Sequence, residues 1–380
     1  MKEMEEWKFS NIKVWIFLFL ISFLLIYRQA CSKVSGHCSD CHTMHYSQGG
    51  GIIVGEWKAG GPFKALLIGD CVFCHTGTNN GTNKTPYVYS GSGVEYNFGG
   101  TRNTLAGGNF YWVTGGNDTC GHNVEGIPGV TIPDPNFEDA TSYPPGYDST
   151  YRDGITWPEN QPVTCAGTYG CHGNFSKENP VEAILGAHHQ NELCNSTTNN
   201  CDGSTVAKSY RFLLGIKGTE DPDWEYTLSK TDHNGYYAVD NPTGGTSNEG
   251  SINYLCGECH GKFHSDTGSG SSPWLRHPTD YDMNHVSSKE YGDYPNISLF
   301  SGKLGVTNTG DYFADVPVGN VQGEVLNSVN GTGKAIVLCI SCHRAHATPF
   351  DDILRWNYRG WPGNSTDDQN GCLACHTTKY

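Results

Sequence analysis

The feature that most constrains this chain is a short motif, Cys-x-x-Cys-His, which occurs five times. This spacing is typical of covalent haem attachment: two thiols add to the vinyl groups of one haem, and the histidine binds the iron as an axial ligand. A single copy would also fit half of a zinc site or a redox-active dithiol. Five copies, none with a second ligand pair at matched spacing, argue against both. The copies are Cys38-Ser-Asp-Cys41-His42, Cys71-Val-Phe-Cys74-His75, Cys256-Gly-Glu-Cys259-His260, Cys339-Ile-Ser-Cys342-His343 and Cys372-Leu-Ala-Cys375-His376.

A sixth, less regular copy reads Cys165-Ala-Gly-Thr-Tyr-Gly-Cys171-His172, with five residues between its cysteines. The alternative interpretation is a disulfide that happens to precede a histidine. We predict a haem here, because glycine relaxes the backbone limits and lets a longer loop bring two thiols to two vinyl groups. The sequence therefore predicts six covalent haem c groups with their irons, which use twelve of the 16 cysteines.

The remaining cysteines are Cys31, Cys120, Cys194 and Cys201. Only six polar residues separate Cys194 from Cys201 and no histidine follows, so we predict a local disulfide. Cys120 can pair with Cys31 only if Cys31 survives processing. Disulfides and haem thioethers both imply export from the reducing cytosol.

The first 30 residues also indicate export. An apolar run, Val14–Tyr27, is interrupted only by Ser22 and follows a basic residue, Lys13. It is shorter than the roughly 20 residues that a membrane span needs and suits the core of a signal peptide. We predict a signal peptide or N-terminal apolar segment over residues 1–30, with an uncleaved anchor as the alternative, and one multihaem domain over residues 31–380. The mature form then has no stable membrane span.

Composition favours an irregular fold. The chain has 49 glycines and 18 prolines, and no stretch shows sustained strand alternation or a long helical period. Aromatic residues make up 12% of the chain, which argues against disorder. We predict mostly irregular coil with a few short α-helices and little or no β-sheet, wrapped around a stacked haem chain. The expected helical turns are Cys38–Tyr46, Pro180–His189, Val337–Ala347 and Pro349–Trp356. The net charge of −15 argues against a nucleic-acid partner.

Sixteen histidines are available as axial ligands. Three of them follow a motif histidine by three or four residues, a repeated offset that favours ligation of a neighbouring haem. Two more lie in compact loops, and His188 and His189 end an expected helix, so we predict that one of this pair, His188, is a ligand. His285 is held in reserve, whereas His37 and His233 are expected bystanders. The predicted proximal ligands are His42, His75, His172, His260, His343 and His376, and the predicted distal ligands are His45, His122, His188, His264, His277 and His346.

His45 has a special position. If its segment is helical, His45 lies three positions beyond His42 on the same face. From there it cannot reach the other side of the iron that His42 binds. We therefore expect His45 to serve a different haem, which would join two haems through one short segment.

These residues resemble the OmcS-type hexahaem c-type cytochromes, which polymerise into extracellular nanowires. The resemblance runs through most of the chain in order, and its motifs include Cys-His-Thr-Met-His at 41–45, Gly-His-Asn at 121–123, Leu-Arg-His-Pro at 275–278 and Cys-Ile-Ser-Cys-His-Arg-Ala-His-Ala at 339–347. It implies a coil-rich fold with haems stacked in alternating parallel and T-shaped pairs. It also implies that His45 crosses to the next subunit and ligates the fifth haem there, the one on Cys339, Cys342 and His343.

Two departures from that family concern the third site. Its cysteines are five residues apart instead of two, and the family's histidine just after the motif is replaced by Gly173-Asn-Phe. We therefore expect His188 or His189 to have taken over that role.

The sequence favours an electron conduit over an enzyme. Irons with two histidine ligands have no open position for a substrate. The predicted protein is a secreted cell-surface filament, a head-to-tail homopolymer that passes electrons to extracellular acceptors or other cytochromes. A soluble periplasmic shuttle is the alternative, and a multihaem reductase is the weaker one, because no Cys-x-x-Cys-Lys motif for a lysine-ligated haem occurs.

Overall fold

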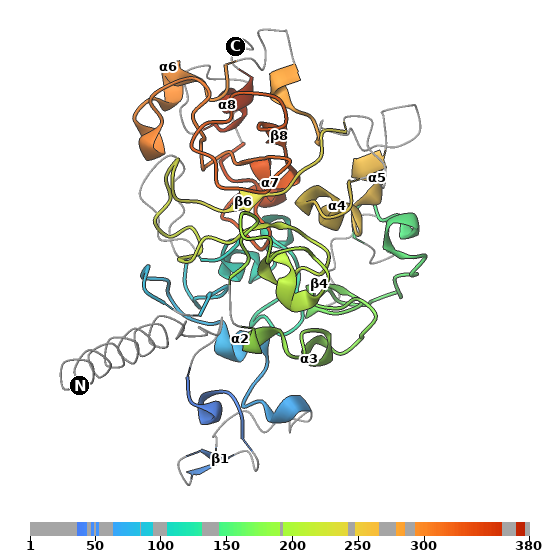
Figure 1. Cartoon of the computed structure of the whole chain (residues 1–380). Helices are drawn as coiled ribbons and strands as arrows, with labels where there is room; N and C mark the ends of the chain where they lie inside the picture. Colours follow the sequence, from blue (N-terminus) through green and yellow to red (C-terminus); the bar gives the residue numbers. More distant parts are fainter. Residues whose placement is uncertain are drawn as a thin grey trace, which may run out of the picture.

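The computed structural model describes twelve segments of the chain. Figure 1 shows them following one another from β1 (Ser47–Gln48) at one end of the molecule to α8 (Cys372–Cys375) at the other, with α2 beside α3 between them. The described residues are 36–43, 47–48, 51–52, 64–83, 85–93, 105–130, 144–190, 193–241, 248–265, 279–285, 293–358 and 370–376.

The described helices are single turns or little more. The α-helices are α2 (Cys71–Cys74), α3 (Pro180–Ala183), α4 (Ile252–Gly257), α5 (Gly261–Ser265), α6 (Ile297–Phe300), α7 (Cys339–Cys342) and α8. The 3-10 turns are η1 (Cys38–Asp40), η2 (Lys64–Leu66), η3 (Phe110–Val113), η4 (Asp118–Cys120), η5 (Ser149–Arg152), η6 (Ala187–His189), η7 (Val206–Lys208), η8 (Tyr210–Phe212), η10 (Met283–His285), η11 (Lys303–Gly305) and η12 (Asp351–Ile353).

Strands are equally short and form two-stranded pairs. Three pairs are antiparallel: β1 with β2 (Gly51–Ile52), β5 (Gly218–Thr219) with β6 (Gly235–Tyr236), and β7 (Val318–Gly319) with β8 (Ile336–Val337). The fourth pair, β3 (Thr164–Ala166) with β4 (Gly170–His172), is parallel. The prediction of a coil-rich fold with little sheet is therefore confirmed.

The four expected helical turns form, but they are shorter than predicted. Near the N-terminus, η1 ends at Asp40, and His42 then bridges to Leu67 in an extended pairing. The Pro180–His189 range splits into α3 and η6, because Gly186 between them adopts a left-handed φ of +80°. The two C-terminal ranges contain only α7 and η12. The described helical turn thus ends before His42, and residues 44–46, which include His45, lie outside the described residues.

Three small hydrophobic clusters take the place of one large core. The first packs Phe300, Phe313 and Trp356 near the C-terminal end. A second lies around Tyr210 and Ile336 and contains both cysteines of the predicted disulfide, and a third surrounds Phe110. All three border the same cavity, because each contributes residues to its lining.

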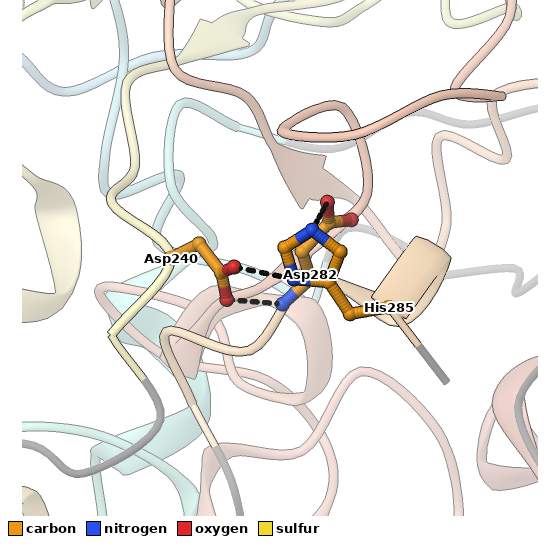
Figure 2. A group of neighbouring side chains, drawn as sticks. All are labelled: Asp240, Asp282 and His285. Atoms are coloured by element: carbon orange, nitrogen blue, oxygen red, sulfur yellow. Dashed lines mark hydrogen bonds and ion pairs between the residues drawn. The ribbon is translucent and has the colours of Figure 1, made fainter. Parts of the chain in front are cut away.

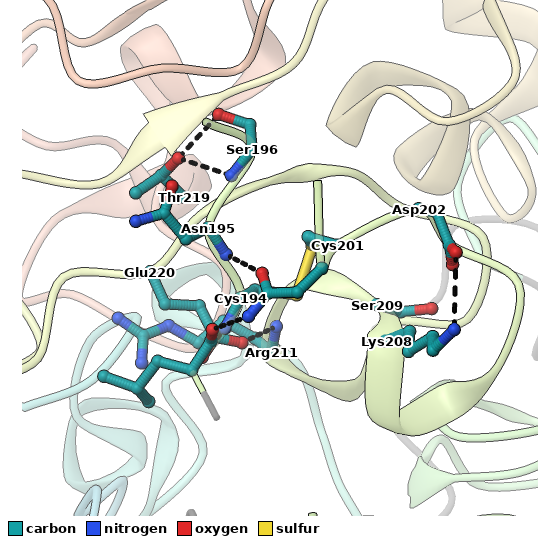
Figure 3. Close-up of a disulfide and its surroundings, with 12 residues drawn as sticks. Cys194, Asn195, Ser196, Cys201, Asp202, Lys208, Ser209, Arg211, Thr219 and Glu220 are labelled. Atoms are coloured by element: carbon teal, nitrogen blue, oxygen red, sulfur yellow. Dashed lines mark hydrogen bonds and ion pairs between the residues drawn. A yellow bond between two sulfur atoms is a disulfide. The ribbon is translucent and has the colours of Figure 1, made fainter. Parts of the chain in front are cut away.

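The Cys194–Cys201 disulfide is present, as predicted (Figure 3). Both cysteines are almost fully buried. Glu220 holds this loop against η8, since its carboxylate accepts hydrogen bonds from the Cys194 N–H (3.2 Å) and the Arg211 N–H (2.6 Å). The disulfide therefore fixes the segment whose Arg211 carbonyl contacts His172 in the third motif.

The predicted signal segment and Cys31 lie outside the described residues, so the export signal and the Cys31–Cys120 pairing stay predictions. Within the part of the chain that the structure describes, every helix is too short or too polar to cross a bilayer.

Replacing Cys194 and Cys201 together with alanine should lower the free energy of unfolding by about 2–3 kcal/mol, because the short closed loop no longer restricts the unfolded chain. Denaturant unfolding followed by far-UV circular dichroism measures this. The double variant should keep every haem, as judged by intact mass. An unchanged unfolding midpoint would contradict the structural role of the bond.

Candidate haem cavity

One connected cavity of about 3640 Å³ runs through the described chain. A pocket for one small molecule usually measures about 300–1,000 Å³, so this space suits several cofactors. Its lining contains every cysteine and every histidine of all six motifs. The six motifs, which are dispersed over more than 300 residues of sequence, therefore face a common interior.

The regular motifs present their thiols from helical turns. In α2, α7 and α8 the two cysteines are the first and last residues of the element, three positions apart and on one face. Burial raises the pKa of Cys74 to about 11 and the pKa values of Cys259 and Cys375 to about 12. These thiols are thus neutral at physiological pH.

The third motif reaches a similar arrangement through strands. Thr164 pairs with Gly170 and Ala166 with His172, which sets Cys165 opposite Cys171 in a parallel ladder. Paired strands lie about 4.8 Å apart, close to the spacing of positions i and i+3 on a helix. Five intervening residues therefore bring the backbones of the two cysteines about as close as those of the regular motifs.

Four histidine pairs face each other across the cavity. Two imidazoles that bind opposite sides of one metal ion, at about 2 Å each, have ring centres roughly 6 Å apart. The measured separations of ring centres are 6.1 Å for His42 and His189, 6.4 Å for His75 and His188, 6.2 Å for His122 and His260, and 6.4 Å for His172 and His346. Each pair joins one motif histidine to one histidine from elsewhere in the chain.

Six of these eight rings, and also the ring of His343, share the same hydrogen bond. In each, Nδ1 lies within 2.9 Å of a backbone carbonyl oxygen, which accepts the Nδ1–H and leaves the Nε2 lone pair for a metal. The contacts are His42 with Ala65, His75 with Pro86, His172 with Arg211, His260 with Pro145, His343 with Asp352, His122 with Ala345 and His346 with Ala106.

Desolvation keeps five of these imidazoles neutral. Desolvation lowers the pKa of His260 to about 4 and that of His346 to about 3, and it also lowers the pKa values of His75, His122 and His172. A neutral ring keeps a lone pair on Nε2, which is the form that binds iron.

Three of the carbonyl acceptors come from a local conformation that sequence reasoning missed. Ala65, Arg211 and Asp352 each have positive φ, as does the residue after each of them, and a leucine then follows in each case. Two consecutive left-handed residues turn the carbonyl sharply toward the histidine. The only sequence feature common to the three sites is a large apolar residue followed by leucine. The pairs are Leu66-Leu67, Phe212-Leu213 and Ile353-Leu354.

The reserve histidine, His285, serves a different contact (Figure 2). It is exposed, its Nδ1 lies 2.7 Å from an Asp240 oxygen, and its Nε2 lies 3.9 Å from an oxygen of buried Asp282. It is not among the residues that line the cavity. His233, an expected bystander, is buried with its ring stacked on Tyr312.

Several predicted distal ligands cannot be placed. His45 and His277 lie outside the described residues, and although His264 belongs to α5, its side chain also lies outside them. Conversely, the structure brings together both His188 and His189 with motif histidines, whereas the sequence predicted a single ligand from this pair.

Two buried arginines also contribute to the lining of the cavity. Arg152 and Arg355 line the cavity and are 4% and 3% exposed. Arg152 Nε and Arg355 Nη1 have no hydrogen-bond partner among the described residues. The cavity volume and the spacing of the histidine rings both fit haem.

Comparison with known proteins agrees with this chemistry. The doubled CXXCH motif family matches residues 331–380, which hold the last two motifs. C-type cytochrome OmcS of Geobacter sulfurreducens is 24% identical over 368 residues, which cover 84% of this chain and 78% of OmcS. The chain resembles OmcS-type cytochromes. This agrees with the resemblance inferred from the motifs, and covalent haem c is the cofactor that the motifs and OmcS share.

Two solved structures of OmcS assemblies are also similar. One is described as the outer membrane cytochrome S filament from Geobacter sulfurreducens, at 20% identity, and the other as OmcS nanowires studied by cryo-electron microscopy, at 22% identity. Each covers 86% of this chain and 85% of the OmcS chain, with a TM-score of 0.42.

Gly107 contacts one of the cavity histidines closely enough to test its placement. Gly107 has φ +67°, and a Cβ added there would lie 2.9 Å from His346 Nδ1. Gly107→Ala should therefore displace the His346 ring and cost more than the roughly 1–2 kcal/mol of left-handed strain alone. Denaturant unfolding and the low-spin signal in electron paramagnetic resonance measure both effects.

Gly116→Ala is the matched control, because Gly116 has φ +87° and open space around its Cβ position. It should show the strain without a spectral change. Equal effects of the two substitutions would mean that His346 is not held where the structure places it.

Proposed function

We propose that this chain is an extracellular multihaem c-type cytochrome that conducts electrons along six covalently bound haems and polymerises head to tail into a filament. The observation that carries the proposal is the shared cavity, lined by all six motifs and containing four histidine pairs at a spacing that suits one iron each. OmcS, to which the chain is similar, is a c-type cytochrome whose solved structures are filaments or nanowires.

The sixth haem is assigned to Cys165, Cys171 and His172. Three features support it: the parallel ladder that sets Cys165 opposite Cys171, the position of His346 across from His172, and the His172 Nδ1–H donated to the Arg211 carbonyl. A disulfide between Cys165 and Cys171 would explain none of the histidine geometry.

Each iron in this proposal has two histidine ligands. Four axial pairs follow from the facing rings: His42 with His189, His75 with His188, His172 with His346, and His260 with His122. Assigning the remaining irons, beside His343 and His376, draws on His45, His264 and His277. When both axial positions are filled by histidine, a haem exchanges single electrons and offers no site for a substrate, so we propose electron transfer and not catalysis.

Head-to-tail assembly would bring two ends of the haem chain together. Motif residues of η1 lie toward one end of the molecule and those of α8 toward the other (Figure 1). A neighbouring copy could therefore place its first motif segment near the last motifs of this copy. His45, four residues after Cys41, is the proposed ligand that crosses this junction to the iron at His343.

The proposed location is outside the cell, on the basis of the N-terminal apolar segment, the disulfide and the thioether chemistry. Proposed partners are further copies of this chain and extracellular acceptors or other cytochromes. A periplasmic shuttle is the competing function, and it differs in needing every iron to be satisfied within one chain.

His188→Ala and His189→Ala test the axial pairs. Consecutive residues of a 3-10 turn point about 120° apart, so each histidine should serve a different iron, beside His75 and His42 respectively. Each variant should convert about one iron in six from low to high spin, and the double variant about two. Electron paramagnetic resonance counts these species.

His285→Ala is the control and should leave all irons low-spin, because His285 contacts Asp240 outside the cavity. A spectrum in which either His188→Ala or His189→Ala matches the parent would remove that residue from the ligand set.

His45→Ala should shorten or abolish filaments and leave about one iron in six high-spin or water-ligated. The first haem should stay attached, because Cys38, Cys41 and His42 are intact. Negative-stain electron microscopy gives filament length. His37→Ala, on the same segment but exposed at the start of η1, is the matched control and should leave the filaments unchanged. Long filaments of His45→Ala with every iron low-spin would favour the shuttle.

A further inference from the structure

Each of the five regular haem motifs contains a backbone hydrogen bond that holds its two cysteines on one helical turn. In each of the five, the histidine N–H donates a hydrogen bond to the carbonyl of the first cysteine, which completes one helical turn. The donor–acceptor distances are 2.8 Å for His42, 3.0 Å for His75, 2.9 Å for His260, 3.1 Å for His343 and 2.9 Å for His376. At the third site His172 follows Cys165 by seven residues, so a single helical turn cannot hold its thiols.

The longer loop of the third site is instead packed against other parts of the chain. Gly167 has φ +92°, and a Cβ there would lie 2.4 Å from the Lys177 carbonyl. A Cβ on Gly170 would lie 2.5 Å from the Thr164 carbonyl. The loop is thus closely packed, and its two glycine carbonyls are directed at one buried side chain.

That side chain is Arg152, the last residue of η5, which lies outside all six motifs. Its Nη2 donates to the Gly170 carbonyl at 2.8 Å and lies 3.3 Å from the Gly167 carbonyl. The guanidinium also lies 4.3 Å from the centre of the Phe175 ring, just beyond the third motif. One planar cation therefore holds both ends of the third loop.

The other arm of the same guanidinium contacts the fourth motif. Arg152 Nη1 lies 3.4 Å from a Glu258 carboxylate oxygen and 3.5 Å from Cys259 Sγ. Arg152 is 4% exposed, and its fork of N–H groups is the geometry that lets one side chain donate in two directions. The third and fourth attachment loops are consequently tied to each other through one residue.

We propose that Arg152 is the positioning residue that allows a five-residue spacing to serve as a haem attachment loop. The loop has backbone hydrogen bonds of its own, from the Gly167 N–H to the His172 carbonyl and from the Gly170 N–H to the Gly167 carbonyl (2.9 Å each), but these do not form a helical turn. By binding the carbonyls of Gly167 and Gly170, Arg152 holds this loop from outside. Through Cys259 and Glu258 it also sets the third loop against the fourth. This proposal rests on the assignment of a haem to Cys165 and Cys171.

Arg152→Lys tests the proposal, since lysine keeps the charge but loses the fork. The control is Arg355→Lys: Arg355 is equally buried and donates from Nε to the Ile340 carbonyl at 2.6 Å, but its loop belongs to a regular motif that closes by itself. Peptide mass spectrometry of the secreted holoprotein gives the haem occupancy of each site, and electron paramagnetic resonance reports the iron ligand field.

In Arg152→Lys, haem occupancy on the Cys165–Cys171 peptide should fall by roughly tenfold, which is the effect of losing one hydrogen bond to a charged group. The first, second, fifth and sixth sites should keep their occupancy, any haem retained at the third site should show an altered low-spin signal, and Arg355→Lys should keep its fifth-site haem.

Unchanged occupancy and spectrum in Arg152→Lys would overturn the proposal, and so would an equal loss at all six sites, which indicates general unfolding. The same measurement on the parent protein separates the role of Arg152 from the assignment of the sixth haem. If the parent protein carries no haem on Cys165 and Cys171, the assignment of the sixth haem is itself wrong.

Discussion

The structure depends on one repeated interaction, the hydrogen bond between the Nδ1–H of a histidine that lines the cavity and a backbone carbonyl. This bond fixes the tautomer and turns Nε2 toward the cavity. Because a carbonyl must point inward at each position, the backbone around it cannot continue as a regular helix or strand. The left-handed residue pairs that begin at Ala65, Arg211 and Asp352 supply three such carbonyls, and each interrupts a 3-10 turn. The coil-rich fold is therefore a consequence of presenting many ligands to one interior.

Shared segments tie the proposed haem sites to one another. His188 and His189 are neighbours in η6 and face the second and first motif histidines. The His122 N–H donates to the His346 carbonyl at 3.1 Å, so the proposed distal ligands of the fourth and third irons are held by one backbone bond. Cysteine side chains of consecutive sites are in contact as well, Cys71 with Cys165 and Cys256 with Cys339. Because neighbouring sites share these contacts, a displacement of one site also displaces the next. The distance between adjacent proposed haems then stays constant.

The motif spacing predicted much of this architecture, because covalent attachment imposes local rules that a single sequence carries. The motif spacing identified the cysteines and histidines that the structure places around the cavity. The Cys194–Cys201 disulfide followed from its short polar loop, and the scarcity of regular secondary structure from the glycine and proline content and the lack of periodicity. The helix lengths could not, since Gly186 and the short C-terminal turns depend on where the chain must bend around the cavity. The position of His189 opposite His42 was missed because the sequence does not show that the cavity borders η6 closely enough for both consecutive side chains to line it. The contacts of Arg152 join residues up to 107 positions apart and leave no local pattern.

The account predicts that the haems form the interior of this protein and that histidines bind them from both sides. Cryo-electron microscopy of the secreted material tests this most directly. The account predicts filaments in which every subunit carries six haems in one continuous row, with an iron midway between the rings of His42 and His189, of His75 and His188, of His172 and His346, and of His122 and His260. Density for fewer haems, irons beside other side chains, or haems too far apart to form one row would contradict it.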